Sequence, residues 1–128
     1  MSYTAQTAYR DMEVLSASPA RLVVIVYDFL LVNLRRTDIA IETRKAELFS
    51  VSLGKSQDAI AELMGELDME RGGQIARELG ALYGFFLSTL IDVARTKDRK
   101  LLARITAQVT ELRDAFAEIA ATQTANAA

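Results

Sequence analysis

After Pro19, the only proline in the chain, apolar residues recur three or four positions apart through four stretches of about 20 residues. This spacing places them on one side of an α-helix, because a helix turns once every 3.6 residues. Leu, Ala, Glu and Arg, which favour helix, are frequent throughout. Short loops between long helices make successive helices run in opposite directions. The sequence therefore predicts an all-α fold, an antiparallel four-helix bundle.

Capping and loop residues indicate where the helices begin and end. Ser18 is a suitable N-cap for a helix that begins at Pro19, and Asp98 is suitable for the last helix. Gly72 and Gly73 mark a loop in which positive φ is available. The four helices are expected over residues 19–43, 45–67, 74–96 and 99–122.

The chain divides into an N-terminal arm at 1–18, the four-helix bundle at 19–122 and an Ala-rich tail at 123–128 that is expected to fray. The arm is polar and lacks the cationic start and apolar core of a secretory signal. The most apolar stretch, residues 22–34, is shorter than the roughly 20 residues that span a bilayer. We expect a cytoplasmic protein without membrane insertion.

Cysteine and histidine are both absent, which removes thiolate chemistry, the usual zinc ligand and the usual proton shuttle. Acidic and basic residues are interspersed and the net charge is −2, so no basic stripe is present to bind nucleic acid. No glycine-rich phosphate loop occurs either. The absence of cysteine and histidine excludes much of enzyme chemistry. We expect a protein that is not an enzyme and that has no cofactor, no metal and no nucleic acid as partner.

The inner rows of the last three helices are almost wholly apolar, with Ser56 and Thr89 as mild exceptions. A small all-α enzyme of the chorismate mutase type would need charged side chains there, so this alternative is disfavoured. The predicted rows are Phe49, Leu53, Ser56, Ile60, Leu63 and Leu67; Ile75, Leu79, Leu82, Phe86 and Val93; and Leu102, Ile105, Val109, Leu112, Phe116 and Ile119.

The helix at 19–43 carries more apolar residues than one buried face requires, and the helix at 74–96 shows a smaller surplus. The surplus residues are buried if the helix is central, and periodicity alone favours this interpretation. Alternatively, part of the surface forms an exposed groove for a partner helix, and homodimerisation would explain the surplus equally well. The residues concerned are Leu22, Val23, Val24, Ile25, Val26, Tyr27, Phe29, Leu30, Leu31, Val32 and Leu34, with Tyr83, Phe85, Leu87, Leu90 and Ile91.

The segment from Ser16 to Asp28, which reads SASPARLVVIVYD, resembles the start of the flagellar secretion chaperones of the FliS family. The resemblance continues over nearly the whole chain without a gap, through Gly72–Ala76 (GGQIA), Leu82–Tyr83 and Leu112–Phe116 (LRDAF), while Thr7–Tyr9 resembles the N-terminal tyrosine arm of the family. Phe29 departs from the pattern, because family members usually have glycine there. Its ring is expected to alter packing or groove shape where helices approach closely.

The resemblance implies a cytosolic export chaperone that binds the disordered C-terminal segment of flagellin, prevents premature polymerisation and assists its flagellar type III secretion. It also implies that the arm can occupy part of the same surface, and other flagellar export or regulatory proteins are further candidate partners. A generic helical adaptor or anti-sigma-type module remains the alternative. The candidate partner-binding residues are Tyr9, Val23, Tyr27, Leu30, Leu34, Tyr83 and Leu87.

Tyr27 and Tyr83 have two interpretations. A buried tyrosine needs only a hydrogen-bond partner for its hydroxyl, whereas an exposed one can anchor a protein interface.

Overall fold

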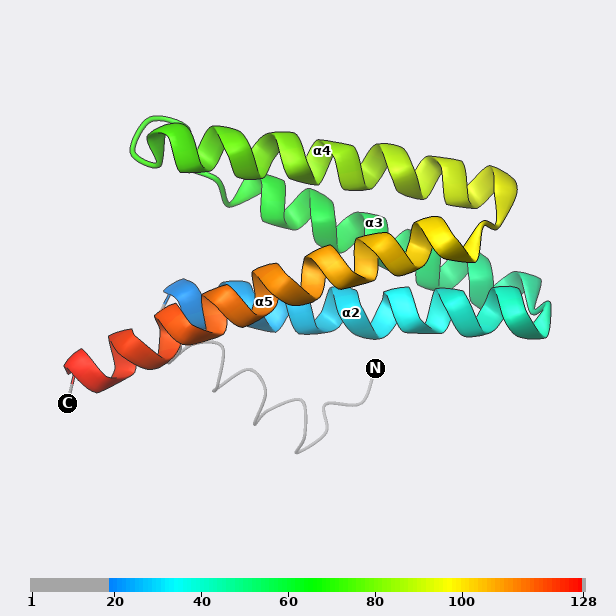
Figure 1. Cartoon of the computed structure of the whole chain (residues 1–128), viewed down its shortest axis with the longest axis horizontal. Helices are drawn as coiled ribbons and strands as arrows, with labels where there is room; N and C mark the ends of the chain where they lie inside the picture. Colours follow the sequence, from blue (N-terminus) through cyan, green and yellow to red (C-terminus); the bar gives the residue numbers. More distant parts are fainter. Residues whose placement is uncertain (1–18, 128) are drawn as a thin grey trace, which may run out of the picture.

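A computed structural model describes residues 19–127 of the chain. Four helices follow one another in this range, and no strand occurs within it: α2 (Pro19–Thr43), α3 (Ala46–Gly65), α4 (Gly73–Thr96) and α5 (Arg99–Ala127). Each helix packs against the next, and α5 returns along α2 (Figure 1). The predicted all-α four-helix bundle is confirmed. The arm and its N-cap Ser18 lie outside the described residues.

The helix boundaries follow the prediction closely, with one extension. The last helix continues to Ala127, past the end predicted at Thr122. Asp98 caps this helix as predicted, because its Oδ1 accepts hydrogen bonds from the backbone N–H groups of Lys100 (2.8 Å) and Leu101 (3.4 Å). The turn after α2 depends on Arg44, which adopts a left-handed φ of 58°. A left-handed arginine leaves no sequence signal of the kind that glycine gives.

The loop between α3 and α4 uses its two glycines for different reasons. Gly73 has a positive φ of 55°, as predicted for the pair. Gly72 has an ordinary φ of −74°, but a Cβ there would lie 2.6 Å from the Cβ of Ala76 and 2.7 Å from the carbonyl oxygen of Asp68. Gly72 is therefore needed because backbone and neighbour approach closely, while Gly73 supplies the turn.

The core fills the space that the four helices enclose, and the predicted inner rows account for most of it. The row of α3 is buried from Phe49 to Leu63. Two predictions at one end of the bundle are wrong: Ile75 is 69% exposed and Ile119 is 47% exposed. The reason is visible in Figure 1, where α4 and α5 meet at the loop that joins them and separate toward the opposite end. Neither helix covers the other at that end.

Tyr27 of α2 and Tyr83 of α4 are buried at the centre of the bundle, and their hydroxyl groups share a hydrogen bond. Tyr83 is buried although it does not belong to the inner row predicted for residues 74–96. The ring of Phe116 packs against that of Tyr27, with centroids 5.6 Å apart. Burial raises the pKa of both phenols above the usual value.

We expect Tyr27→Phe and Tyr83→Phe each to lower the free energy of unfolding by about 1–3 kcal/mol, because each leaves one buried hydroxyl without its partner. The double variant removes both polar groups and is expected to be more stable than either single variant. Urea denaturation of the four proteins tests this order. A double variant whose loss equals the sum of the two single losses would contradict it.

Arg99 at the start of α5 binds Asp38 of α2 through two hydrogen bonds, Nε to Oδ1 at 2.8 Å and an Nη to Oδ2 at 3.0 Å. These hydrogen bonds hold the pKa of Asp38 below its usual value of 3.8. A lowered folded-state pKa stabilises the fold above pH 3.8, and this contribution disappears as the pH falls through the folded-state value.

Both side chains of this pair are partly exposed, so Asp38→Asn is expected to cost less than about 1 kcal/mol at neutral pH. The difference from wild type should shrink below pH 3.8 and in high salt. Urea denaturation at several pH values measures it. A difference that is independent of pH would show that the ion pair is not its cause.

Candidate binding groove between α2 and α3

The outer face of α2 carries a second apolar stripe, in addition to the one that enters the core. Leu22, Ile25, Phe29 and Val32 follow one another at intervals of three and four residues, on the side of the helix opposite Tyr27 and the rest of its core face. Leu22, Phe29 and Val32 are 37%, 45% and 41% exposed, and Ile25 is half-buried. The apolar surplus of this helix therefore belongs to two faces, of which only one is covered by the described residues.

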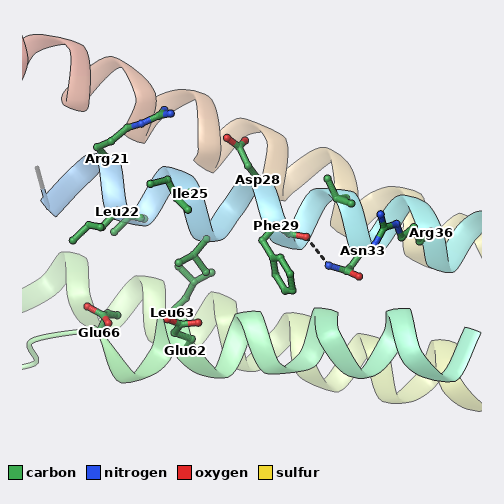
Figure 2. Close-up of a pocket in the computed structure, with 13 residues that line it drawn as sticks. Arg21, Leu22, Ile25, Asp28, Phe29, Asn33, Arg36, Glu62, Leu63 and Glu66 are labelled. Carbon is green, nitrogen blue, oxygen red and sulfur yellow. Dashed lines mark hydrogen bonds between the residues drawn. The ribbon is translucent and has the colours of Figure 1, made fainter. Parts of the chain in front are cut away.

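This stripe forms one wall of a groove of about 780 Å³ between α2 and the end of α3 (Figure 2). Its α2 side extends from Arg21 to Arg36, which corresponds to a length of about 22 Å at 1.5 Å per residue. That length fits about four turns of a helix. The lining residues are Arg21, Leu22, Val23, Ile25, Val26, Asp28, Phe29, Val32, Asn33 and Arg36 of α2, with Glu62 and Leu63 of α3 and Glu66 directly after it.

Charged side chains surround the apolar wall on both helices. Arg21 and Arg36 lie at the two ends of the α2 side, Glu62 lies on α3, and Glu66 directly follows the end of α3 (Figure 2). Asp28 turns toward α5, where it accepts a hydrogen bond of 2.8 Å from Nε of Arg113 and thereby raises the pKa of that guanidinium. The groove thus combines an apolar wall with a rim that carries both signs of charge.

Phe29 contributes the largest apolar side chain of the groove. Figure 2 shows its ring extending from α2 toward α3, and the ring is nearly half exposed. The bulky side chain at this position therefore forms part of the groove wall and is not enclosed between the two helices. Its backbone oxygen accepts a hydrogen bond of 2.9 Å from Nδ2 of Asn33, one turn further along the same helix.

The candidate partner-binding residues occupy three different environments. Val23 is half-buried and lines the groove, and Leu87 is half-buried on α4, away from it. Four candidates are inside the core: Tyr27, Leu30, Leu34 and Tyr83. Tyr9 lies outside the described residues. For the two tyrosines, the structure corresponds to the interpretation of a buried, hydrogen-bonded phenol.

The four residues of the outer stripe line the groove but were not among the candidates selected from the sequence: Leu22, Ile25, Phe29 and Val32. Their three-and-four spacing was present in the sequence, parallel to the stripe that is buried. The signal was therefore available, but it did not reveal which of the two stripes faces outward.

Within residues 19–127, no group of three or more acidic side chains is placed to hold a metal ion. No helix in this part of the chain is long and apolar enough to cross a membrane. An open groove with an apolar wall and a charged rim on a helical bundle is typical of protein-binding modules.

Comparison with known proteins then identifies the family. The sequence profile of the family described as "Flagellar protein FliS" matches residues 1–123. The chain is 30% identical to the flagellar secretion chaperone FliS of Bacillus subtilis over 86% of its own length and 81% of that protein. It is 27% identical to the flagellar secretion chaperone FliSB of Pseudomonas aeruginosa, over 83% of this chain and 84% of that protein. It is also 27% identical to the flagellar secretion chaperone FliS of Vibrio cholerae, over 85% of this chain and 80% of that protein. The chain belongs to the FliS family.

Proposed function

We propose that this protein is a flagellar export chaperone that binds the C-terminal segment of flagellin, prevents its premature polymerisation and assists its secretion through the flagellar type III apparatus. Membership of a family whose curated relatives are named flagellar secretion chaperones supports the role. The observation that carries the binding step is the groove between α2 and α3, because its exposed apolar wall fits an amphipathic helix.

The groove wall replaces most of the earlier candidates as the contact surface. Leu22, Phe29 and Val32 would contact the client directly, with Val23 beside them. The charged rim would orient the client helix and keep the empty groove hydrated. A client that is disordered before binding loses chain entropy as it folds into the groove, so its affinity is lower than the contact area alone suggests.

Calorimetric titration with the C-terminal segment of flagellin from the same organism tests the function. One-to-one binding with a distinctly negative heat-capacity change is expected, because apolar surface is buried as the segment folds. A scrambled segment of the same composition serves as the control. An absence of binding at micromolar concentrations would contradict the proposal and leave a generic helical adaptor as the better interpretation.

We further propose that the N-terminal arm, through Tyr9, competes with the client for the apolar surface. Removal of residues 1–15 is then expected to increase client affinity, because the client no longer has to displace the arm. The same titration measures the change, with Tyr9→Ala in the full chain as the finer variant. Unchanged affinity in both variants would refute competition by the arm.

A further inference from the structure

The carboxamide of Asn33 lies in the groove wall, and one of its two polar atoms has no partner among the described residues. Asn33 is only 1% exposed, and its Nδ2 donates to the backbone oxygen of Phe29. Its Oδ1 is buried and accepts no hydrogen bond from the part of the chain that the structure describes. Figure 2 shows the carboxamide beside the ring of Phe29, on the side of α2 that faces the groove.

The other buried polar side chains near this position are satisfied. Thr37 donates to the backbone oxygen of Asn33 at 2.7 Å, and Ser52 donates to that of Leu48 at 2.7 Å. The hydroxyls of Thr37 and Ser52 also lie 2.9 Å apart. Asn33 is therefore an exception among its neighbours, and an unpaired buried acceptor destabilises the free protein. A leucine at this position would have a higher helix propensity and would bury no polar group.

We propose that Oδ1 of Asn33 is a specificity determinant, which accepts a hydrogen bond from a client helix bound in the groove. This inference rests on the proposed function and adds a chemical requirement to the client. The backbone N–H groups inside a helix are already used by that helix, so the donor has to be a side chain. A neutral donor avoids the cost of burying a charge, so Ser, Thr, Asn or Gln is expected within the apolar stripe of the client.

The charges of the rim restrict the client further. Glu62 and Glu66 border the α3 side of the groove, and Arg36 lies one turn beyond Asn33 on α2. The client helix is therefore expected to carry basic residues on the flank that faces α3 and an acidic residue near the level of Arg36. The polar residue in the stripe fixes the register, since a shift by one turn would leave both the donor and Oδ1 unpaired.

Asn33→Leu tests the proposal because it should change stability and binding in opposite directions. The substitution keeps the branched shape and the number of heavy atoms of the side chain and removes the unpaired acceptor, so the urea midpoint of the free protein is expected to rise. Affinity for the flagellin C-terminal segment is expected to fall at least about tenfold, because the client donor then loses its partner. Thr37→Val is the matched control, since Thr37 is buried in the same helix but does not line the groove. It should lower the urea midpoint and leave the affinity unchanged.

A set of client variants identifies the donor. Each neutral polar residue in the apolar stripe of the flagellin segment is replaced by alanine and titrated against wild type and Asn33→Leu. One replacement is expected to weaken binding to wild type about tenfold and to have no effect on binding to Asn33→Leu. If Asn33→Leu bound every client variant with the same affinity as the wild-type chaperone does, the proposal would be overturned. A fall in the urea midpoint of Asn33→Leu would overturn it as well.

The remaining outcomes separate this proposal from the function on which it rests. If the wild-type chain does not bind the segment at all, the proposed function fails and this inference fails with it. If the wild type binds and Asn33→Leu binds equally well, only this inference fails. If Asn33→Leu changed self-association in sedimentation experiments and left client affinity unchanged, the groove would be assigned to a second copy of the chain. If it changed only the effect of removing residues 1–18, the groove would be assigned to the arm. Either result would also overturn the proposal.

Discussion

Replacing Phe29 with alanine is expected to weaken binding of the flagellin segment at least about thirtyfold, while the bundle remains folded. Phe29 is the largest apolar side chain of the groove wall and is nearly half exposed. Aromatic residues at the centre of a protein interface commonly contribute about 2 kcal/mol or more, which corresponds to this factor. Because the ring is only partly covered in the free protein, the free energy of unfolding should change by less than about 1.5 kcal/mol.

Phe85→Ala is the matched control for this prediction. Phe85 is also a phenylalanine inside a helix and is 55% exposed, but it lies on α4 and does not line the groove. Its replacement should leave the affinity within about threefold of wild type, as is usual for residues outside the centre of an interface. Calorimetric titration of both variants gives the comparison. Equal losses would indicate that the client uses a surface other than the groove.

Replacing Phe86 with alanine is expected to lower the free energy of unfolding by about 3–5 kcal/mol. The side chain is completely buried, and its ring lies 6.4 Å from those of Tyr83 and Phe85. Alanine leaves a cavity that the surrounding helices cannot fill. Since small domains are stable by only about 5–15 kcal/mol, this single change removes a large fraction of the stability.

The neighbouring Phe85 again provides the control, because the two positions differ mainly in burial. Phe85→Ala is expected to cost less than about 1 kcal/mol. Urea denaturation followed by far-ultraviolet circular dichroism measures both variants, and an unchanged slope would confirm that the same surface is exposed on unfolding. Similar losses for the two variants would be incompatible with the burial that the structure assigns to them.

Local features of the sequence were sufficient to predict the helices. Helix periodicity, the scarcity of proline, the N-cap at Asp98 and the turn at Gly72 and Gly73 act over a few residues, so they can be recognised without knowing the neighbours of a helix. The start of α2 at Pro19 was predicted from Ser18 and Pro19, and its end near Thr43 was predicted only approximately, because neither glycine nor proline follows it. The absence of cysteine and histidine could likewise be read from the sequence without a structure.

The face of each helix that is covered depends on its neighbours, and only the tertiary structure decided it. The two apolar stripes of α2 look equivalent in the sequence, but α3, α4 and α5 enclose the one that contains Tyr27 and leave the one that contains Phe29 outside. Ile75 and Ile119 continue regular inner rows and are nevertheless exposed, because α4 and α5 separate at that end. Periodicity shows that a face is apolar, whereas burial depends on what packs against it.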